Sequence, residues 1–111
     1  INGQANAETV NGRQVSATGG LLDFARGARA SRGGKSIIAL PATAMRGSRS
    51  RIVARLSSPI TTLCRADVDY VVTEYGCASL FGQCTEARAR SLVDIAAPGF
   101  RDELWQAWEN S

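Results

Sequence analysis

A pair of glycines, Gly19 and Gly20, stands directly before a segment whose pattern predicts a helix over residues 21–30. The first backbone N–H groups of a helix have no partner within the helix, so they attract negative charge. Glycine lets a ligand approach these groups closely, because it has no side chain. The alternative interpretation is an ordinary turn before the helix.

Lys35 follows a second pair of glycines and opens a predicted strand over residues 36–40. An ammonium group at that position suits an anionic ligand as a point charge. The alternative is a solvated lysine at the end of a strand. Arg26, Arg29 and Arg32 could extend this cationic patch, although a solvated position is the interpretation we favour for each of them.

The stretch from residue 24 to residue 66 contains no Asp or Glu. Its basic residues are Arg26, Arg29, Arg32, Lys35, Arg46, Arg49, Arg51, Arg55 and Arg65. Such an excess implies either an anionic partner or a neighbouring acidic surface, and a nucleic-acid-binding module is one alternative. The chain has no helix-turn-helix, zinc or RNP-type signature, and few aromatic residues lie among the arginines. We therefore expect no nucleic-acid partner.

The composition excludes several kinds of chemistry. The chain has no histidine, so it contains no Ser–His or Cys–His catalytic pair and no His-ligated metal. Its three cysteines form no CxxC pair, which favours free thiols in a reducing, cytoplasmic compartment. No apolar run approaches the roughly 20 residues of a membrane span, and no secretory signal is visible. The 111 residues suit one domain, and because they begin at Ile1 we interpret them as a piece of a longer chain.

Strand and helix patterns alternate along the chain, which predicts an α/β fold. Asn11-Gly12 predicts a hairpin within residues 8–16, because both positions tolerate φ > 0. Further strands are expected over residues 36–40, 51–56 and 68–73, and loops over residues 42–49 and 74–82. Helices are expected over residues 21–30, 86–97 and 99–110.

Three stretches of the chain, taken in order, resemble one protein family. They are SATGGLLDF at residues 16–24, GGKSIIALPATA at residues 33–44 and DVDYVVTEYGCASL at residues 67–80. Together they resemble the C-terminal domain of the acetyl-CoA hydrolase/transferase family, which includes acetate- and 4-hydroxybutyrate-type CoA-transferases. The ordered set covers nearly the whole chain and is highly specific. Ala17 and Leu21 depart from the family pattern, which affects the expected CoA contacts and leaves the fold assignment intact.

The resemblance implies a subunit several times longer than this chain, with two related α/β domains and an active site between them. The present domain would hold a central, mostly parallel sheet flanked by helices. A glutamate upstream of Ile1 would attack an acyl-CoA thioester and pass through an anhydride to a glutamyl-CoA thioester. A carboxylate such as acetate or 4-hydroxybutyrate would then complete the transfer, or water would complete a hydrolysis.

In the resembled family the glycine loop faces the thioester. Gly20 would therefore supply an oxyanion-hole amide, and Gly19, Gly20 and Lys35 would contact coenzyme A. Coenzyme A is a substrate in this chemistry, and no tightly bound cofactor or metal is expected. The expected partners are acyl-CoA, a small carboxylate, the remainder of the same subunit and a second subunit in a homodimer. The alternative is a non-catalytic CoA-binding or scaffold domain.

Three other features have structural interpretations. Asp23 lies in the first turn of the helix over residues 21–30, where it complements the helix dipole. Trp105 and Trp108 form a stripe that we expect to pack against another domain or subunit. Glu74 is an acid in an expected loop, and the family pattern gives it a structural role rather than that of the nucleophile.

Overall fold

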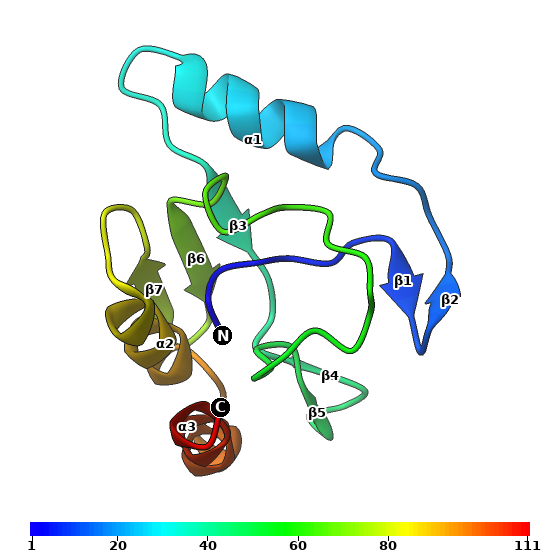
Figure 1. Ribbon diagram of the computed structural model, residues 1–111, viewed down its shortest axis with the longest axis vertical. Coiled ribbons are helices and arrows are strands. Elements are labelled where there is room, and N and C mark those ends of the chain that lie inside the picture. Colours follow the sequence, from blue (N-terminus) through cyan, green and yellow to red (C-terminus); the bar gives the residue numbers. More distant parts are fainter.

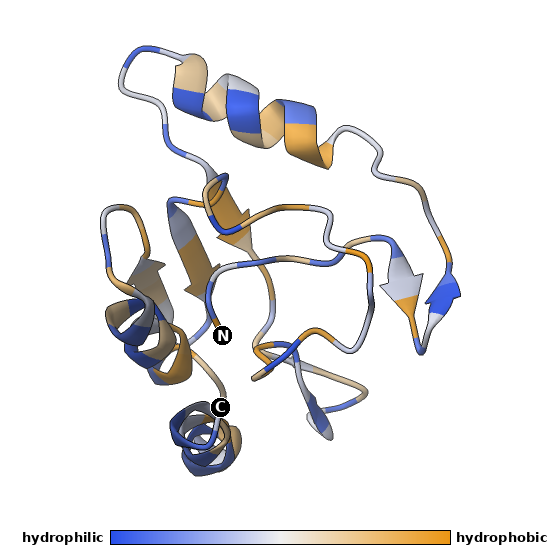
Figure 2. Cartoon of the chain, in the orientation of Figure 1, coloured by the Kyte–Doolittle hydropathy of each residue, from blue (hydrophilic) through white to orange (hydrophobic).

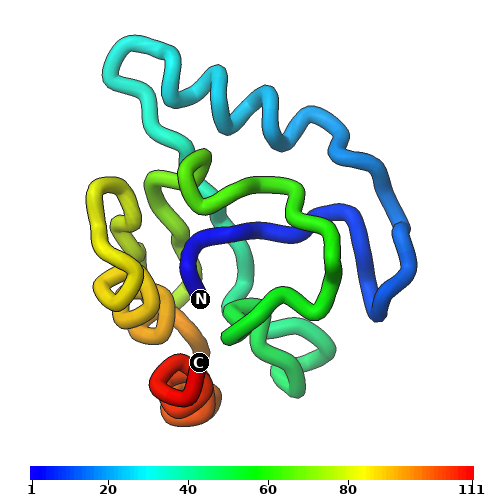
Figure 3. Tube along the Cα trace, viewed as in Figure 1, coloured from blue at the N-terminus to red at the C-terminus, as the bar shows by residue number.

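The computed structural model describes residues 1–111 as short strands and helices that alternate along the chain (Figures 1 and 3). The strands are β1 (Thr9–Val10), β2 (Arg13–Gln14), β3 (Ile37–Ala39), β4 (Thr43–Ala44), β5 (Arg49–Ser50), β6 (Tyr70–Thr73) and β7 (Gly76–Ser79). The helices are α1 (Leu21–Ala30), α2 (Thr85–Asp94) and α3 (Arg101–Glu109), with the 3₁₀ turn η1 (Pro98–Phe100) before α3. No helix combines the length and apolar character that crossing a membrane requires.

The predicted hairpin at Asn11-Gly12 is confirmed. Strands β1 and β2 pair antiparallel, and the two turn residues have φ of 49° and 76°. Positive φ at both central positions gives the turn a twist that matches the flanking strands. The predicted helix over residues 21–30 is also confirmed as α1 with the same ends. The helix expected over residues 86–97 is confirmed as α2, which ends three residues earlier at Asp94.

The largest sheet has the strand order β3-β6-β7. Strand β3 runs parallel to β6, whereas β6 runs antiparallel to β7. The expected central, mostly parallel sheet is therefore not present within these residues, because the other two sheets are antiparallel hairpins. The expected loop over residues 74–82 is wrong at β7. Residues 74 and 75 form a tight turn, and such a turn joins antiparallel neighbours, whereas parallel strands need a long crossover.

The strand expected over residues 51–56 is wrong. The chain instead forms the β4–β5 hairpin over residues 43–50, with Thr43 opposite Ser50, so the loop expected over residues 42–49 is wrong at both strands. Its tip holds Met45 and Arg46 at φ of 51° and 55°, which reverses the chain before residue 51 is reached. Ile52 then enters the core without belonging to a strand.

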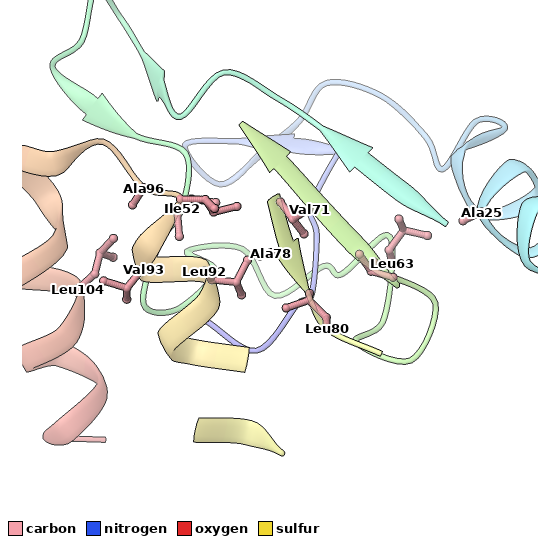
Figure 4. Packing of buried hydrophobic residues seen from close by; sticks show 12 residues of the cluster. Ala25, Ile52, Leu63, Val71, Ala78, Leu80, Leu92, Val93, Ala96 and Leu104 are labelled. Atoms are coloured by element: carbon pink, nitrogen blue, oxygen red, sulfur yellow. The ribbon is translucent and has the colours of Figure 1, made fainter. Parts of the chain in front are cut away.

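One face of the β3-β6-β7 sheet packs against helix α2. Figure 4 shows Leu92 of α2 beside Ala78 of β7, while Val93 lies toward Leu104 of α3. All four side chains belong to one buried apolar cluster. Helix α1 differs, because Ala25 is its only buried residue and it lies at the margin of the fold (Figure 1).

Candidate functional site

The Gly19-Gly20 loop leads directly into α1, as the sequence predicted. Gly19 has φ of 57°, and Gly20 is the N-cap residue without a side-chain cap. The first turn of the helix closes where the Phe24 amide donates to the Gly20 carbonyl oxygen at 2.9 Å. The amides before Phe24 in this turn have no partner within the helix. The loop therefore presents free N–H donors at the positive end of a helix dipole.

Gly20 also has a steric reason to be glycine. A β-carbon at this position would lie 3.2 Å from the ring of Phe24, closer than ordinary contact distance. The Phe24 side chain is 81% exposed, so it lies over the loop without belonging to the core. Backbone at Gly20 thus stays open to a ligand on the side away from the ring.

Lys35 lies at the other end of α1, after the Gly33-Gly34 turn. Its side chain is exposed, and its Nζ lies 5.4 Å from the centre of the Tyr70 ring. It borders a small pocket of about 200 Å³ whose other lining residues are Arg29, Gly34, Asp69, Tyr70 and Phe81. A cation with free N–H donors at the edge of a pocket can hold a phosphate group.

Arg26 and Arg29 do not provide free positive charge. Arg29 Nε lies 3.2 Å from Asp69 Oδ1, and Arg26 Nε lies 3.3 Å from Asp67 Oδ1. Two arginines of the acid-free block thus pair with acidic residues that follow the block directly in the sequence. A neighbouring acidic surface was one of the two explanations expected for the excess of basic residues. Of the basic residues near α1, Lys35 is the better candidate for an anionic ligand.

Asp67 and Asp69 have different surroundings. Asp67 accepts a hydrogen bond from the Cys64 thiol at 3.0 Å, and this bond is the main cause that lowers the pKa of Asp67. Burial opposes that effect, while the hydrogen bond and charge of Arg26 add to it. Asp69 is buried, and its Oδ2 accepts the backbone N–H of Ser36 at 2.8 Å.

Asp69 is a positioning residue that the sequence analysis did not single out. It holds α1 through Arg29 and the start of β3 through Ser36, so it lies between both candidate binding elements. A signal was present in the sequence, because Asp67 and Asp69 are the first acids after the long basic block. Local sequence patterns cannot predict the pairing of Arg29 with Asp69, because the two residues are 40 positions apart.

The two candidate binding positions are not brought into one cluster. Gly20 precedes α1, whose ten residues make a helix about 15 Å long, and Lys35 follows it after the Gly33-Gly34 turn. Figure 1 shows α1 along one side of the fold. An elongated ligand with a reactive group at one end and phosphates at the other suits such an arrangement better than a compact one.

Glu74 has a structural contact. Its Oε2 accepts the backbone N–H of Ala42 at 2.8 Å, which ties the β6–β7 turn to the segment before β4. Trp105 packs partly against the core of this chain, and its ring lies 4.7 Å from the Arg90 guanidinium carbon. Asp23 lies in the first turn of α1, where it complements the dipole as expected.

Comparison with known proteins identifies the family. The model of the acetyl-CoA hydrolase/transferase C-terminal domain matches residues 1–108. A 4-hydroxybutyrate coenzyme A transferase of Clostridium kluyveri is 50% identical over 103 residues, which are 92% of this chain and 24% of that protein. A butyryl-CoA:acetate CoA-transferase of Anaerostipes caccae is 43% identical over 106 residues, again 92% of this chain and 24% of that protein.

A solved structure gives the same result. The crystal structure of RipA from Yersinia pestis superposes with a TM-score of 0.90 at 49% identity, covering 98% of this chain and 24% of that one. The chain thus spans about a quarter of the length of the relatives it matches. Sequence motifs, the family model and the fold agree, and this chain belongs to the acetyl-CoA hydrolase/transferase family as its C-terminal domain.

Proposed function

We propose that this domain works within a longer CoA-transferase subunit, which exchanges coenzyme A between an acyl-CoA thioester and a carboxylate such as acetate or 4-hydroxybutyrate. Family membership supports the reaction class, because the matched relatives bear the names of CoA-transferases. The uncapped start of α1 at Gly19-Gly20 is the observation that carries the role of this domain.

The chemistry begins outside these residues. A glutamate carboxylate in the preceding part of the subunit attacks the thioester carbonyl carbon, and the carbonyl oxygen becomes negatively charged. Expulsion of the CoA thiolate leaves an acyl-glutamyl anhydride. The thiolate then attacks the glutamyl carbonyl carbon and releases the acyl carboxylate, which gives the glutamyl-CoA thioester.

The second half repeats these steps in reverse with the acceptor. The incoming carboxylate attacks the glutamyl thioester and forms a new anhydride while the CoA thiolate leaves. The thiolate attacks the acyl carbonyl carbon, which yields the new acyl-CoA and restores the glutamate. Water in place of the carboxylate yields hydrolysis instead.

The domain contributes electrostatic stabilisation and binding. The Gly20 amide donates to the oxyanion of each tetrahedral intermediate, where preorganised N–H groups are most effective. Gly19 provides the left-handed backbone that turns the amide toward the ligand. Lys35 contacts the phosphates of coenzyme A at the far end of α1, where the thioester and phosphates of this long molecule match the two ends of the helix.

Mass spectrometry of the intact full-length subunit tests the proposal. Incubation with acetyl-CoA should produce a protein carrying one CoA group, and the adduct should disappear when a carboxylate acceptor is added. Release of CoA into water without an acceptor would favour the hydrolase alternative. A subunit that forms no adduct with any short acyl-CoA would favour a non-catalytic CoA-binding or scaffold domain.

A further inference from the structure

Glu8 carries a buried carboxyl group that the proposed chemistry does not use. The residue is 8% exposed, and none of the three ion pairs of the chain involves it. Its Oε2 atom accepts a hydrogen bond from the Thr62 hydroxyl at 2.7 Å, and Thr62 is itself 6% exposed. A buried carboxyl group without a cationic partner lowers stability relative to an apolar residue, which points to a role other than stabilising the core.

The Thr62 hydroxyl group has a fixed direction. Its oxygen accepts the Ala7 amide at 2.9 Å, so its single proton is available for the Glu8 carboxyl group. The Thr62 amide in turn donates to the Ala5 carbonyl oxygen at 2.9 Å. A chain of hydrogen bonds thus joins the first residues of the protein to Thr62, and it ends on Glu8, which is 54 positions away in the sequence.

The backbone of Glu8 holds the segment that leads to the glycine loop. Its carbonyl oxygen accepts the Val15 amide at 2.8 Å and the Ser16 amide at 3.2 Å. The first bond continues the pairing of β1 with β2, and the second fixes the direction in which the chain leaves this hairpin. Gly19 and Gly20 follow directly along the chain, before α1 begins.

Little else holds the segment between β2 and α1. All residues from 15 to 20 are exposed, and Figure 2 colours most of this connection in pale shades of intermediate hydropathy. Between the Ser16 amide and the Gly20 carbonyl oxygen, no backbone group of the segment bonds to another element. The Ser16 hydroxyl bonds only to the neighbouring Ala17 carbonyl oxygen. The position of the glycine loop therefore depends on its two ends, which are held by Glu8 and by the first turn of α1.

We infer that Glu8 is a positioning residue for the proposed reaction. The hydrogen bond from Thr62 fixes the Glu8 side chain, and the Glu8 carbonyl oxygen fixes residues 15 and 16. This end of the loop then sets the direction of the Gly20 amide. An oxyanion donor is most effective when it is held in the correct geometry before the reaction begins. The role of Glu8 rests on the proposed oxyanion function of Gly20, and it supplies the group that keeps this amide in place.

Steady-state kinetics of the full-length subunit separate positioning from binding. Glu8→Ala should lower kcat about 10-fold and leave the KM for acyl-CoA within about 2-fold, because the amide acts on the transition state. Glu8→Gln keeps an acceptor oxygen for Thr62 and should retain at least about half of kcat. An equal loss of kcat in both variants would overturn the inference, because the hydrogen bond would then not be the cause. A raised KM with unchanged kcat in Glu8→Ala would overturn it as well.

A destabilised core variant serves as the matched control for these kinetics. Val93→Ala shortens a side chain of the buried apolar cluster. It should lower the thermal midpoint of the subunit, yet it should leave kcat unchanged at a temperature well below that midpoint. A kcat of Val93→Ala that falls as far as that of Glu8→Ala would assign the loss to general destabilisation and overturn the inference.

Hydrogen exchange in the full-length subunit measures the anchor separately from the reaction. Thr62→Val replaces the hydroxyl with a methyl group of similar size, and the amides of residues 15–20 should then exchange at least about 10-fold faster. Thr62→Ser keeps the hydroxyl and should leave their exchange unchanged. Thr61→Val, at the exposed neighbouring position, is the matched control and should also leave it unchanged. Slow exchange in Thr62→Val, or equally fast exchange in Thr61→Val, would contradict the inference.

The anchor and the transferase proposal can fail independently, because loop exchange and formation of the CoA adduct are measured separately. A loop that Thr62→Val loosens, in a subunit that forms no CoA adduct, would retain the anchor and remove the transferase proposal. A CoA adduct in a subunit whose loop exchange does not respond to Thr62→Val would retain the transferase proposal and remove the anchor.

Discussion

Arg29 and Asp69 form an ion pair that joins α1 to the sheet, with 3.2 Å between Arg29 Nε and Asp69 Oδ1. The other oxygen of Asp69 accepts the Ser36 amide at the start of β3. Arg29 also donates to the Ala66 carbonyl oxygen and lies 5.7 Å from the centre of the Phe81 ring. Because α1 buries only Ala25, these polar contacts are a large share of what holds the helix in place.

Removal of this contact should cost more stability than removal of the neighbouring ion pair. We expect Arg29→Ala to lower the free energy of unfolding by about 1–3 kcal/mol, because Asp69 is buried and loses its charged partner. Arg26→Ala should cost at most about 1 kcal/mol, because the Arg26 side chain is 63% exposed and solvent screens its pair with Asp67. Urea denaturation of the two variants measures both values. Equal losses would mean that Arg29 does not anchor the helix.

The approach of Phe24 to Gly20 gives a test of the oxyanion role. Gly20→Ala should lower kcat of the full subunit by at most about 10-fold, because the new methyl group meets the Phe24 ring and the ring and the amide must shift by a few tenths of an ångström. Phe24→Ala alone should keep nearly full activity. The double variant should recover most of the loss, since the obstacle is gone. Steady-state kinetics of the three variants decide this, and a failed recovery would point to a different reason for glycine.

Lys35 should matter for binding more than for the chemical step. Lys35→Ala should raise the KM for acyl-CoA about 10-fold with little change in kcat, because a phosphate contact acts equally on the ground state and the transition state. Lys35→Arg should retain most of the affinity through its charge. Arg32→Ala is the matched control at an exposed position nearby. An unchanged KM in Lys35→Ala would leave Lys35 as a solvated residue.

Because the pKa of Asp67 is lowered in the folded state, part of the free energy of unfolding is lost at acid pH. The usual pKa of this carboxyl group is 3.8. As the pH falls, the group therefore binds a proton at a higher pH in the unfolded chain than in the folded one. The contribution is therefore complete above about pH 5 and is lost as the pH falls through the lower pKa of the folded state. Cys64→Ala removes the main cause of the shift and should flatten the fall in the free energy of unfolding between about pH 4 and pH 2. Cys84→Ala, with its exposed thiol, should leave the pH profile unchanged.

Local features of the sequence were sufficient for a substantial part of the structure. Asn11-Gly12 predicted the hairpin because backbone conformation at those two positions depends on the residues themselves. The helix over residues 21–30 followed from its apolar spacing, and the glycine pair before it was correctly placed at its start. The three ordered motifs identified the family, which the comparisons then confirmed.

Local features also misled in two places. The apolar residues of RIVARL suggested a strand, but Ile52 reaches the core through irregular chain after the β4–β5 hairpin. The glycines at 76 and 82 suggested a loop, although β7 begins at the first of them. In both places, whether the segment forms a strand depended on the presence of a neighbouring strand to pair with. Strand propensity depends strongly on such neighbours.

The sequence by itself determined the family, the positions of the helices and the residue types at the candidate site, because these depend on order and local conformation. Only the tertiary structure decided that Asp69 holds Arg29 across 40 residues and that one face of the sheet is open. Such relationships arise from contacts between segments far apart in the chain. No local pattern encodes them, because each segment is compatible with many partners until the whole chain has packed.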